Sequence, residues 1–155
     1  MYGKNAWFKH VDDTKAVMDF AEGYKKYISV GKTERLAVEE AVKILNANGF
    51  KNADSVKSVS VGDKVYFINK NKNIAAFVIG EKPLEEGLRI LGAHIDSPRL
   101  DLKEHPFYEN KTFAYADTHY YGGVKKYQWV TIPLALHGVV CKKDGSKVVV
   151  NIGED

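Results

Sequence analysis

The chain has 155 residues, of which 45% are hydrophobic and 28% charged, with 13 glycines, 4 prolines and one cysteine. This composition excludes a disordered chain, a collagen-like or low-complexity chain and a disulfide-stabilised scaffold, and it provides enough apolar residues for a core. The net charge is +3, but 20 acidic residues are interleaved with 23 basic ones, so charge alone indicates no polyanionic partner.

Two helices are predicted in the first third of the chain. Apolar residues recur at helical spacing from Asp13 to Ile28, and Gly31 follows where a left-handed C-terminal cap is expected. Thr33 is the predicted N-cap of a second helix, which ends at Asn48-Gly49 and has an apolar stripe from Val38 to Leu45. We therefore expect a pair of helices, with the stripe of the second one buried.

Strands are predicted in the rest of the chain. Two β-branched and aromatic runs, at 65–68 and 74–79, are separated by the polar residues Asn69–Asn73 and predict a hairpin. The run Leu88–Ala93 predicts another strand, which ends in small residues. Further strands are predicted at Arg99–Lys103, Trp129–Val140 and Lys147–Ile152.

The character of the chain changes near Pro98, from helices and a hairpin to strands with a dense aromatic stretch, so we predict a domain boundary there. The chain stops at Asp155, directly after a predicted strand and without a closing element. We interpret the sequence as a piece of a longer protein.

The sequence shows no apolar stretch of about 18 residues, and its amino terminus lacks the apolar run of a signal peptide. We therefore expect no membrane partner. The lone Cys141 has no evident catalytic partner and is interpreted as a buried structural thiol. These features are typical of a cytoplasmic protein in a reducing compartment.

The segment LGAHIDSPRLDLK, residues 91–103, contains the strongest candidate for a functional site. His94 follows a predicted strand that ends in small residues, and ligands in open α/β sheets collect beyond such strand ends. In extended backbone His94 and Asp96 face the same side, so Asp96 can accept the second imidazole N–H while the other nitrogen binds a metal. The alternative is an ordinary His–Asp hydrogen bond.

One histidine and one aspartate do not complete a zinc site, which needs three or four protein ligands. The other histidines lack a partner at helical spacing, and we interpret them as surface or packing residues. They are His10, His105, His119 and His137.

The stretch Phe107–Trp129 combines many aromatic residues with three lysines. Such a stretch can bind single-stranded nucleic acid through stacking and phosphate contacts, or it can form a protein interface, where Tyr and Trp are enriched. Glu109 and Asp117 offset two of the lysines, which favours the interface.

The residues His94-Ile95-Asp96-Ser97-Pro98 resemble a motif of the aspartyl aminopeptidase family, which are zinc-dependent aminopeptidases that assemble as tetrahedral dodecamers. The resemblance extends over nearly the whole chain. Other similar segments are Tyr24–Lys26, Gly31–Arg35, Ala75–Gly80, Tyr121–Gly123 and Trp129–Leu134.

The resemblance implies an α/β fold. Residues 1–98 would form the amino-terminal part of a zinc-exopeptidase domain, with the helix pair, the hairpin and a central strand, and residues 99–155 would begin a β-rich dimerisation domain. It further implies two zinc ions per full-length subunit, with His94 as a ligand of one and Asp96 as the catalytic-site residue that orients His94. The remaining ligands and the general base would follow Asp155, so this chain alone is expected to be inactive.

The function implied by the resemblance is a zinc-dependent aminopeptidase that removes amino-terminal residues, with acidic residues as an expected class, from peptides. The expected partners are peptide substrates and further copies of the protein in a homo-oligomer, with no nucleic acid. The alternative is a noncatalytic β-rich module in which the stretch Phe107–Trp129 binds nucleic acid or protein.

Overall fold

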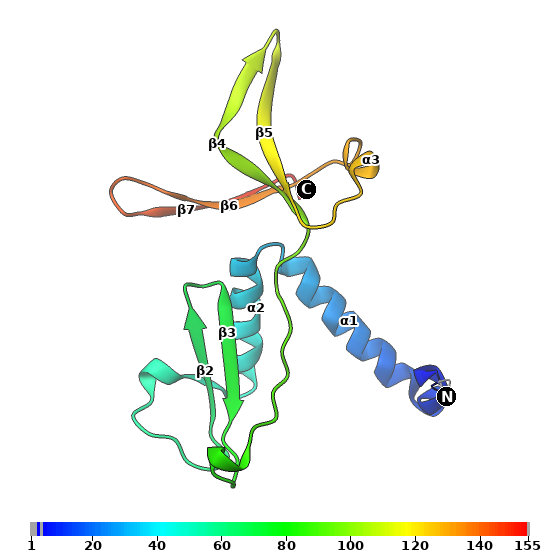
Figure 1. Ribbon diagram of the computed structural model, residues 1–155, viewed down its shortest axis with the longest axis vertical. Helices are drawn as coiled ribbons and strands as arrows, with labels where there is room; N and C mark the ends of the chain where they lie inside the picture. Colours follow the sequence, from blue (N-terminus) through cyan, green and yellow to red (C-terminus); the bar gives the residue numbers. More distant parts are fainter. Residues whose placement is uncertain (1–2, 4, 155) are drawn as a thin grey trace. The chain divides into compact units, whose positions relative to one another are not determined.

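The computed structural model describes residue 3 and residues 5–154, whose contacts form two units that divide between Ala93 and His94. The first unit contains α1 (Thr14–Val30), α2 (Glu34–Ala47), β1 (Lys51–Asn52), β2 (Lys64–Asn69), β3 (Asn73–Val78) and the short turns η1 (Ala6–Lys9), η2 (Val11–Asp13), η3 (Ala53–Ser55) and η4 (Leu84–Glu86) (Figure 1). The second contains β4 (Arg99–Asn110), β5 (Phe113–Tyr121), α3 (Lys126–Trp129), β6 (Leu136–Cys141) and β7 (Lys147–Ile152). The roles assigned to residues 1–98 and 99–155 stay a prediction.

The two predicted helices are confirmed as α1 and α2. Thr33 caps α2 as expected, because its Oγ1 accepts a hydrogen bond of 3.3 Å from the backbone N–H of Leu36. At the other end Asn48 is the C-cap, and Gly49 takes a φ of 82°, a conformation that favours glycine. The local capping residues therefore define both ends of α2.

The predicted left-handed cap at Gly31 is wrong, because this residue has a φ of −77°. Its glycine is instead required by a close approach between the helices. A Cβ at Gly31 would lie 3.2 Å from the Cα and Cβ of Ala37 and 3.3 Å from the carbonyl oxygen of Tyr27. The Tyr27 hydroxyl also donates to the Ala37 carbonyl oxygen, at 3.2 Å. The start of α2 therefore packs directly against the end of α1.

The core of the first unit lies around α2 and the small sheet. The predicted hairpin is confirmed as β2 and β3, which pair antiparallel, while β1 adds in parallel to β2. The buried apolar residues are Ala37 and Val38 of α2 with Val65 and Tyr66 of β2. Because consecutive strand residues point to opposite faces, β2 is covered on both sides.

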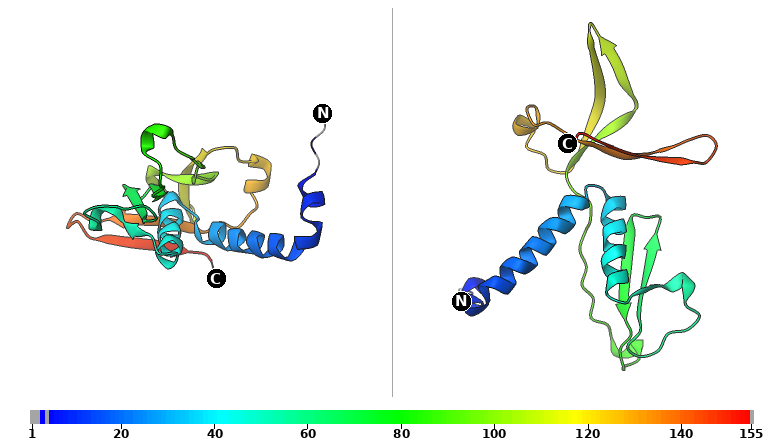
Figure 2. Two further views of the ribbon diagram at one scale, coloured as in Figure 1. Left: turned by 90° about the horizontal axis from the view of Figure 1, so that it is seen from below. Right: turned by 180° about the vertical axis from the view of Figure 1, so that it is seen from behind.

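The apolar face of α1 is largely exposed. Figures 1 and 2 show α1 leading away from α2 after their contact near Gly31. Phe20 is 81% exposed and Tyr24 61% exposed. The helical spacing of these residues predicts the helix correctly. It does not predict whether another element covers them.

The strand predicted at Leu88–Ala93 is not present. The segment has no regular secondary structure, and Leu91 and Ile90 are 102% and 80% exposed. A strand needs a neighbouring backbone to complete its hydrogen bonds, and the described residues provide no such partner for this segment. The structure thus confirms the helix pair and the hairpin of the expected domain, but not its central strand.

The second unit begins with a long antiparallel hairpin. The predicted strand at Arg99–Lys103 is the start of β4, which pairs with β5 from Arg99↔Tyr121 to Asn110↔Phe113. The pairing shifts between Leu102 and Phe107. Pro106 lies within this shift, where its missing N–H interrupts no ladder hydrogen bond. The sequence does not predict β5 as a strand, because the aromatic residues of this segment indicate a protein interface instead.

The second hairpin is formed by β6 and β7. The prediction for Lys147–Ile152 is confirmed, but the strand expected over Trp129–Val140 begins only at Leu136. Residues up to Trp129 form α3 instead, and Pro133 follows without an N–H to donate. Cys141 is a free and exposed thiol, so the buried thiol predicted there is wrong. The hairpin has no layer over it, among the described residues, that would bury this side chain.

The second unit has no buried apolar residue among its described positions, because all the buried apolar residues belong to α2 and β2. Two-stranded hairpins are at best marginally stable alone. This unit therefore needs further surface from elsewhere to be well ordered.

Among the described residues, no helix is both long and apolar enough to cross a membrane.

Substitutions at two glycines should change stability in opposite directions. Gly31→Ala places a Cβ against Ala37 and Tyr27, and we expect it to lower the free energy of unfolding by about 1 to 3 kcal/mol. Gly23 lies within α1 with no atom within 4 Å of an added Cβ. Gly23→Ala should therefore raise the free energy of unfolding, by up to about 1 kcal/mol. Urea unfolding followed by circular dichroism tests both, and equal effects would contradict the packing at Gly31.

Candidate metal centre

His94 lies in the segment that leads into β4, and its imidazole is held by Asp96 in two ways. The Nδ1 atom of His94 lies 2.8 Å from the backbone carbonyl oxygen of Asp96 and 3.2 Å from its Oδ1. A carbonyl oxygen can only accept, so Nδ1 carries the proton. The other nitrogen, Nε2, then has a lone pair available for a metal ion. The spacing of two residues thus brings the two side chains together as predicted, with a backbone contact added.

Both side chains are accessible to solvent. The His94 side chain is 82% exposed and that of Asp96 is 38% exposed. An exposed imidazole can bind a metal ion without any rearrangement of the chain around it. The metal-ligand role of His94 nevertheless stays a prediction.

The second carboxylate oxygen of Asp96 has a partner from a distant part of the sequence. The hydroxyl of Tyr121, 25 residues away, donates to Asp96 Oδ2 at 2.8 Å. This hydrogen bond, followed by one from the backbone amide of Asp96 itself, lowers the pKa of the Asp96 carboxyl below its usual range. The side chain of Asp96 is therefore held as a carboxylate between Tyr121 and His94.

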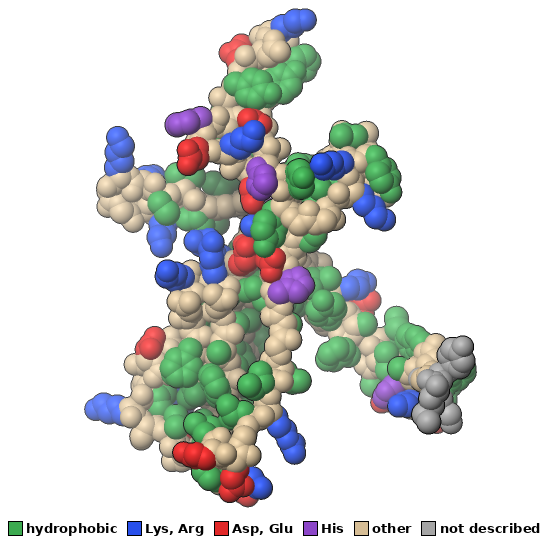
Figure 3. Space-filling model, viewed as in Figure 1, with side chains coloured by type: hydrophobic (Ala, Val, Ile, Leu, Met, Phe, Trp, Pro, Cys, Tyr) green, Lys and Arg blue, Asp and Glu red, His purple; other side chains and the backbone are tan. Residues whose placement is uncertain are grey.

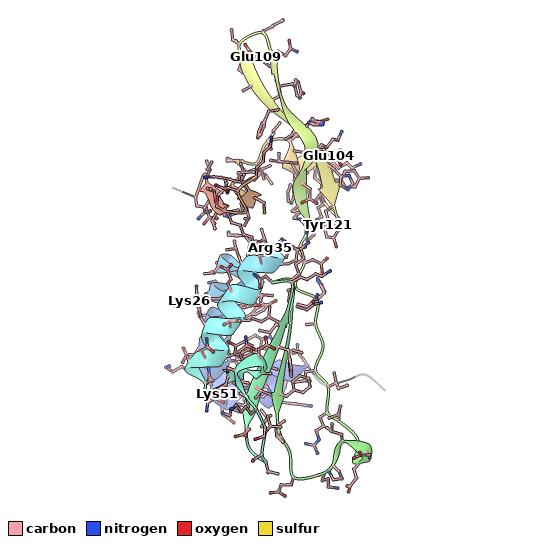
Figure 4. All side chains as sticks on the ribbon, turned by 90° about the vertical axis from the view of Figure 1, so that its left-hand side faces the viewer. Lys26, Arg35, Lys51, Glu104, Glu109 and Tyr121 are labelled. Carbon is pink, nitrogen blue, oxygen red and sulfur yellow. The ribbon has the colours of Figure 1, made fainter. Side chains whose placement is uncertain are left out.

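Tyr121 is the last residue of β5 and lies at the base of the hairpin (Figure 4). It is paired in register with Arg99, whose guanidinium carbon lies 4.2 Å from the centre of the Tyr121 ring. The Nε of Arg99 in turn donates to Asp101 Oδ1 at 2.7 Å. Sequence reasoning missed Tyr121 as a site residue. Its one signal was its place in a segment similar to the family, next to Gly122-Gly123.

The chain also approaches itself closely at this point. Gly122 has a φ of 75°, and a Cβ added there would lie 3.4 Å from the Cα of Pro98. The turn after β5 therefore packs against the residue that precedes β4. Through this contact the base of the hairpin stays next to the segment that contains His94 and Asp96.

The described residues contain no cluster of three or more His, Cys, Asp or Glu side chains that could hold a metal ion. His94 fits one ligand position, because its tautomer leaves Nε2 available. Two of the histidines that were not predicted as ligands have other partners. His119 stacks on Tyr120, and Nε2 of His137 lies 3.1 Å from Glu154 Oε1. The described part of the chain therefore offers one candidate ligand with its supporting carboxylate.

The pKa of Asp96 provides a test of this arrangement. In the metal-free chain, the pKa of the Asp96 carboxyl should lie below its ordinary value of 3.8. The hydrogen bond from Tyr121 should be present while Asp96 is ionised, and it should be lost as the pH falls through this lowered pKa. Tyr121→Phe removes the donor and should raise the pKa. Tyr120→Phe, at the neighbouring position, should not change it. Carbon-13 NMR of the Asp96 carboxyl measures both, and an unchanged midpoint in Tyr121→Phe would refute the geometry.

Comparison with known proteins identifies relatives along almost the whole chain. The model of the family described as aminopeptidase I zinc metalloprotease (M18) matches residues 27–155. The probable M18 family aminopeptidase 1 of Clostridium acetobutylicum is 50% identical over 157 residues, covering 98% of this chain. That of Thermotoga maritima is 41% identical over 154 residues, covering 99% of it. The chain spans 34% of the length of each of these two relatives.

Solved structures give the same result for the fold. The crystal structure of aminopeptidase I from Borrelia burgdorferi B31 matches with a TM-score of 0.89 and 40% identity, over 97% of this chain and 37% of that one. The M18 aminopeptidase of Thermotoga maritima matches with a TM-score of 0.89 and 41% identity, over 100% and 34%. The predicted α/β fold class is thereby confirmed. On the sequence match and these structures together, the chain belongs to the M18 family of aminopeptidase I zinc metalloproteases.

Proposed function

We propose that this chain is part of a longer zinc-dependent aminopeptidase that removes amino-terminal residues, acidic ones among them, from peptides. Membership of the M18 family supports the reaction class. The observation that carries the proposal is the arrangement of His94, whose Nδ1 is engaged within the chain while its exposed imidazole has Nε2 available. That is the state in which a histidine binds zinc.

His94 and Asp96 have separate roles in this proposal. His94 would hold one of two zinc ions per subunit, and Asp96 would keep the imidazole in the correct tautomer and direction. When bound, zinc ions polarise a peptide carbonyl and activate water. The described residues supply too few ligands for such a site. We therefore place the remaining ligands and the general base beyond Asp155, and we expect this chain to be inactive alone.

We further propose that the β4–β5 hairpin binds another copy of the protein, so that the enzyme is a homo-oligomer, with a dodecamer as the expected assembly. Figure 3 shows apolar side chains gathered toward the tip of this hairpin. Phe107 is 72% exposed and Phe113 64% exposed. Exposed apolar patches of this kind usually mark association surfaces.

The nucleic-acid alternative is less well supported by the contacts of the basic residues. Within the stretch Phe107–Trp129, Lys126 lies 4.2 Å from the centre of the Tyr120 ring. Asp117 is paired at 2.9 Å with Lys103, which precedes the stretch on β4, and not with one of its three lysines. Charges engaged in this way are less available to neutralise phosphates. The free thiol of Cys141 fits a reducing compartment, and we propose a cytoplasmic location.

Replacement of His94 tests the proposed function. In the full-length enzyme, His94→Ala should remove a zinc ligand and abolish turnover, while Asp96→Asn should lower zinc affinity or activity by about 10- to 100-fold. His105→Ala, at an exposed position on β4, is the matched control and should change neither. Zinc content and release of amino-terminal Asp or Glu from short peptides are the measurements. Full zinc content and normal turnover in His94→Ala would contradict the proposal.

The proposed assembly surface has its own test. Changing Phe107 and Phe113 together to Ser should shift the full-length protein to smaller species in sedimentation velocity, because it removes the exposed apolar contact. Lys143→Ser, at an exposed polar position in the turn of the other hairpin, is the control and should leave the size unchanged. A wild type that sediments as a monomer and binds single-stranded DNA with steep salt dependence would instead support the binding module.

A further inference from the structure

We propose that Tyr121 is a positioning residue of the metal site, because its hydroxyl fixes the Asp96 carboxylate in the orientation that holds His94. This inference rests on the proposed function of His94 as a metal ligand. Tyr121 lies 25 residues from Asp96 and belongs to β5, so the proposal extends the site from one short motif to the base of a hairpin.

The first step concerns the carboxylate. The terminal torsion of an aspartate side chain has a broad energy profile, so a single hydrogen bond leaves its plane poorly defined. In this structure each oxygen has its own partner: Oδ2 accepts from the Tyr121 hydroxyl at 2.8 Å, and Oδ1 lies 3.2 Å from His94 Nδ1. Two contacts on different oxygens define the plane of the carboxylate. The backbone carbonyl oxygen of Asp96, 2.8 Å from Nδ1, anchors the His94 ring, and the carboxylate plane supplies the second contact that limits its direction.

The second step concerns Tyr121 itself, which is held from three directions. Its backbone pairs with Arg99 in the β4–β5 ladder, and the Arg99 guanidinium stacks at 4.2 Å from its ring centre. The Arg99 side chain is in turn tied to Asp101 by the 2.7 Å hydrogen bond. The following residue, Gly122, packs against Pro98. The tyrosine hydroxyl is therefore presented to Asp96 by a scaffold and not by a freely rotating side chain.

The third step separates positioning from stability. Asp96 and His94 are both accessible to solvent, so water can replace the hydroxyl of Tyr121 at little cost in folding free energy. Water does not, however, reproduce the direction of a donor fixed to a strand. Loss of the hydroxyl should therefore disturb the imidazole while leaving the stability of the chain nearly unchanged.

Tyr121→Phe in the full-length enzyme is the direct test, with Tyr120→Phe as the matched control. The Tyr120 ring contacts a different set of partners, His119 and Lys126. We expect Tyr121→Phe to weaken zinc binding by about 10- to 100-fold, measured by competition with a chelator, and to lower kcat more than it changes KM. Tyr120→Phe should leave zinc affinity and kcat unchanged. Wild-type zinc affinity in Tyr121→Phe would overturn the proposal.

A double-mutant cycle tests whether Tyr121 acts through Asp96. If it does, the variant that combines Tyr121→Phe with Asp96→Asn should bind zinc about as tightly as Asp96→Asn alone, because the carboxylate that Tyr121 orients is already absent. Losses that multiply would show that Tyr121 acts on the site by another route, and they would overturn the inference.

A measurement that involves no metal separates this inference from the proposed function. Carbon-13 relaxation of the His94 ring in the metal-free, full-length enzyme should show one fixed ring orientation in wild type and in Tyr120→Phe, and a more mobile ring in Tyr121→Phe. The Nδ1–H tautomer should persist in all three proteins, because the backbone carbonyl oxygen of Asp96 still accepts from Nδ1. An unchanged ring mobility in Tyr121→Phe overturns the inference, whatever His94 does in the enzyme. Normal zinc content in His94→Ala overturns the proposed function, whatever the ring mobility shows.

Discussion

The antiparallel pairing of Arg99 with Tyr121 is the constraint on which the candidate site depends. It sets the register at the base of β4 and β5, places the Tyr121 hydroxyl 2.8 Å from Asp96, and brings Gly122 against Pro98. Side chains alternate along a strand, so a slip of one residue would turn Tyr121 to the opposite face. The carboxylate would then lose one of its two partners. A long-range pairing of backbones thus determines the geometry of a short local motif.

The site is held by geometry more than by burial. Its charged and polar side chains are exposed, and exposed hydrogen bonds contribute little to the free energy of folding. The unit that contains them has no buried apolar residue among its described positions, whereas the first unit has a core around α2 and β2. A metal ligand on a unit without a core of its own should gain order from additional protein surface. This dependence agrees with the chain's spanning 34% of the length of the relatives from Clostridium acetobutylicum and Thermotoga maritima.

Sequence patterns were reliable where structure depends on neighbouring residues. The cap at Thr33 and the polar turn between β2 and β3 are local devices, and both appear as predicted. Patterns were less reliable where structure depends on a partner. The run Leu88–Ala93 has the composition of a strand but finds no neighbouring strand, and Cys141 has apolar neighbours in sequence but no layer to cover it. Burial and strand pairing are properties of two segments, so one segment cannot reveal them.

The sequence by itself determined the helix pair, the first hairpin and the proximity of His94 and Asp96, because these follow from short spacings. It also identified the family, through the resemblance of segments along nearly the whole chain. Only the tertiary structure decided that Gly31 is needed for a close approach to Ala37, and that Tyr121 reaches Asp96 across 25 residues. Periodicity tells which side chains share a face of one element. It contains no information about the register of two strands, which is decided when distant segments pair and pack.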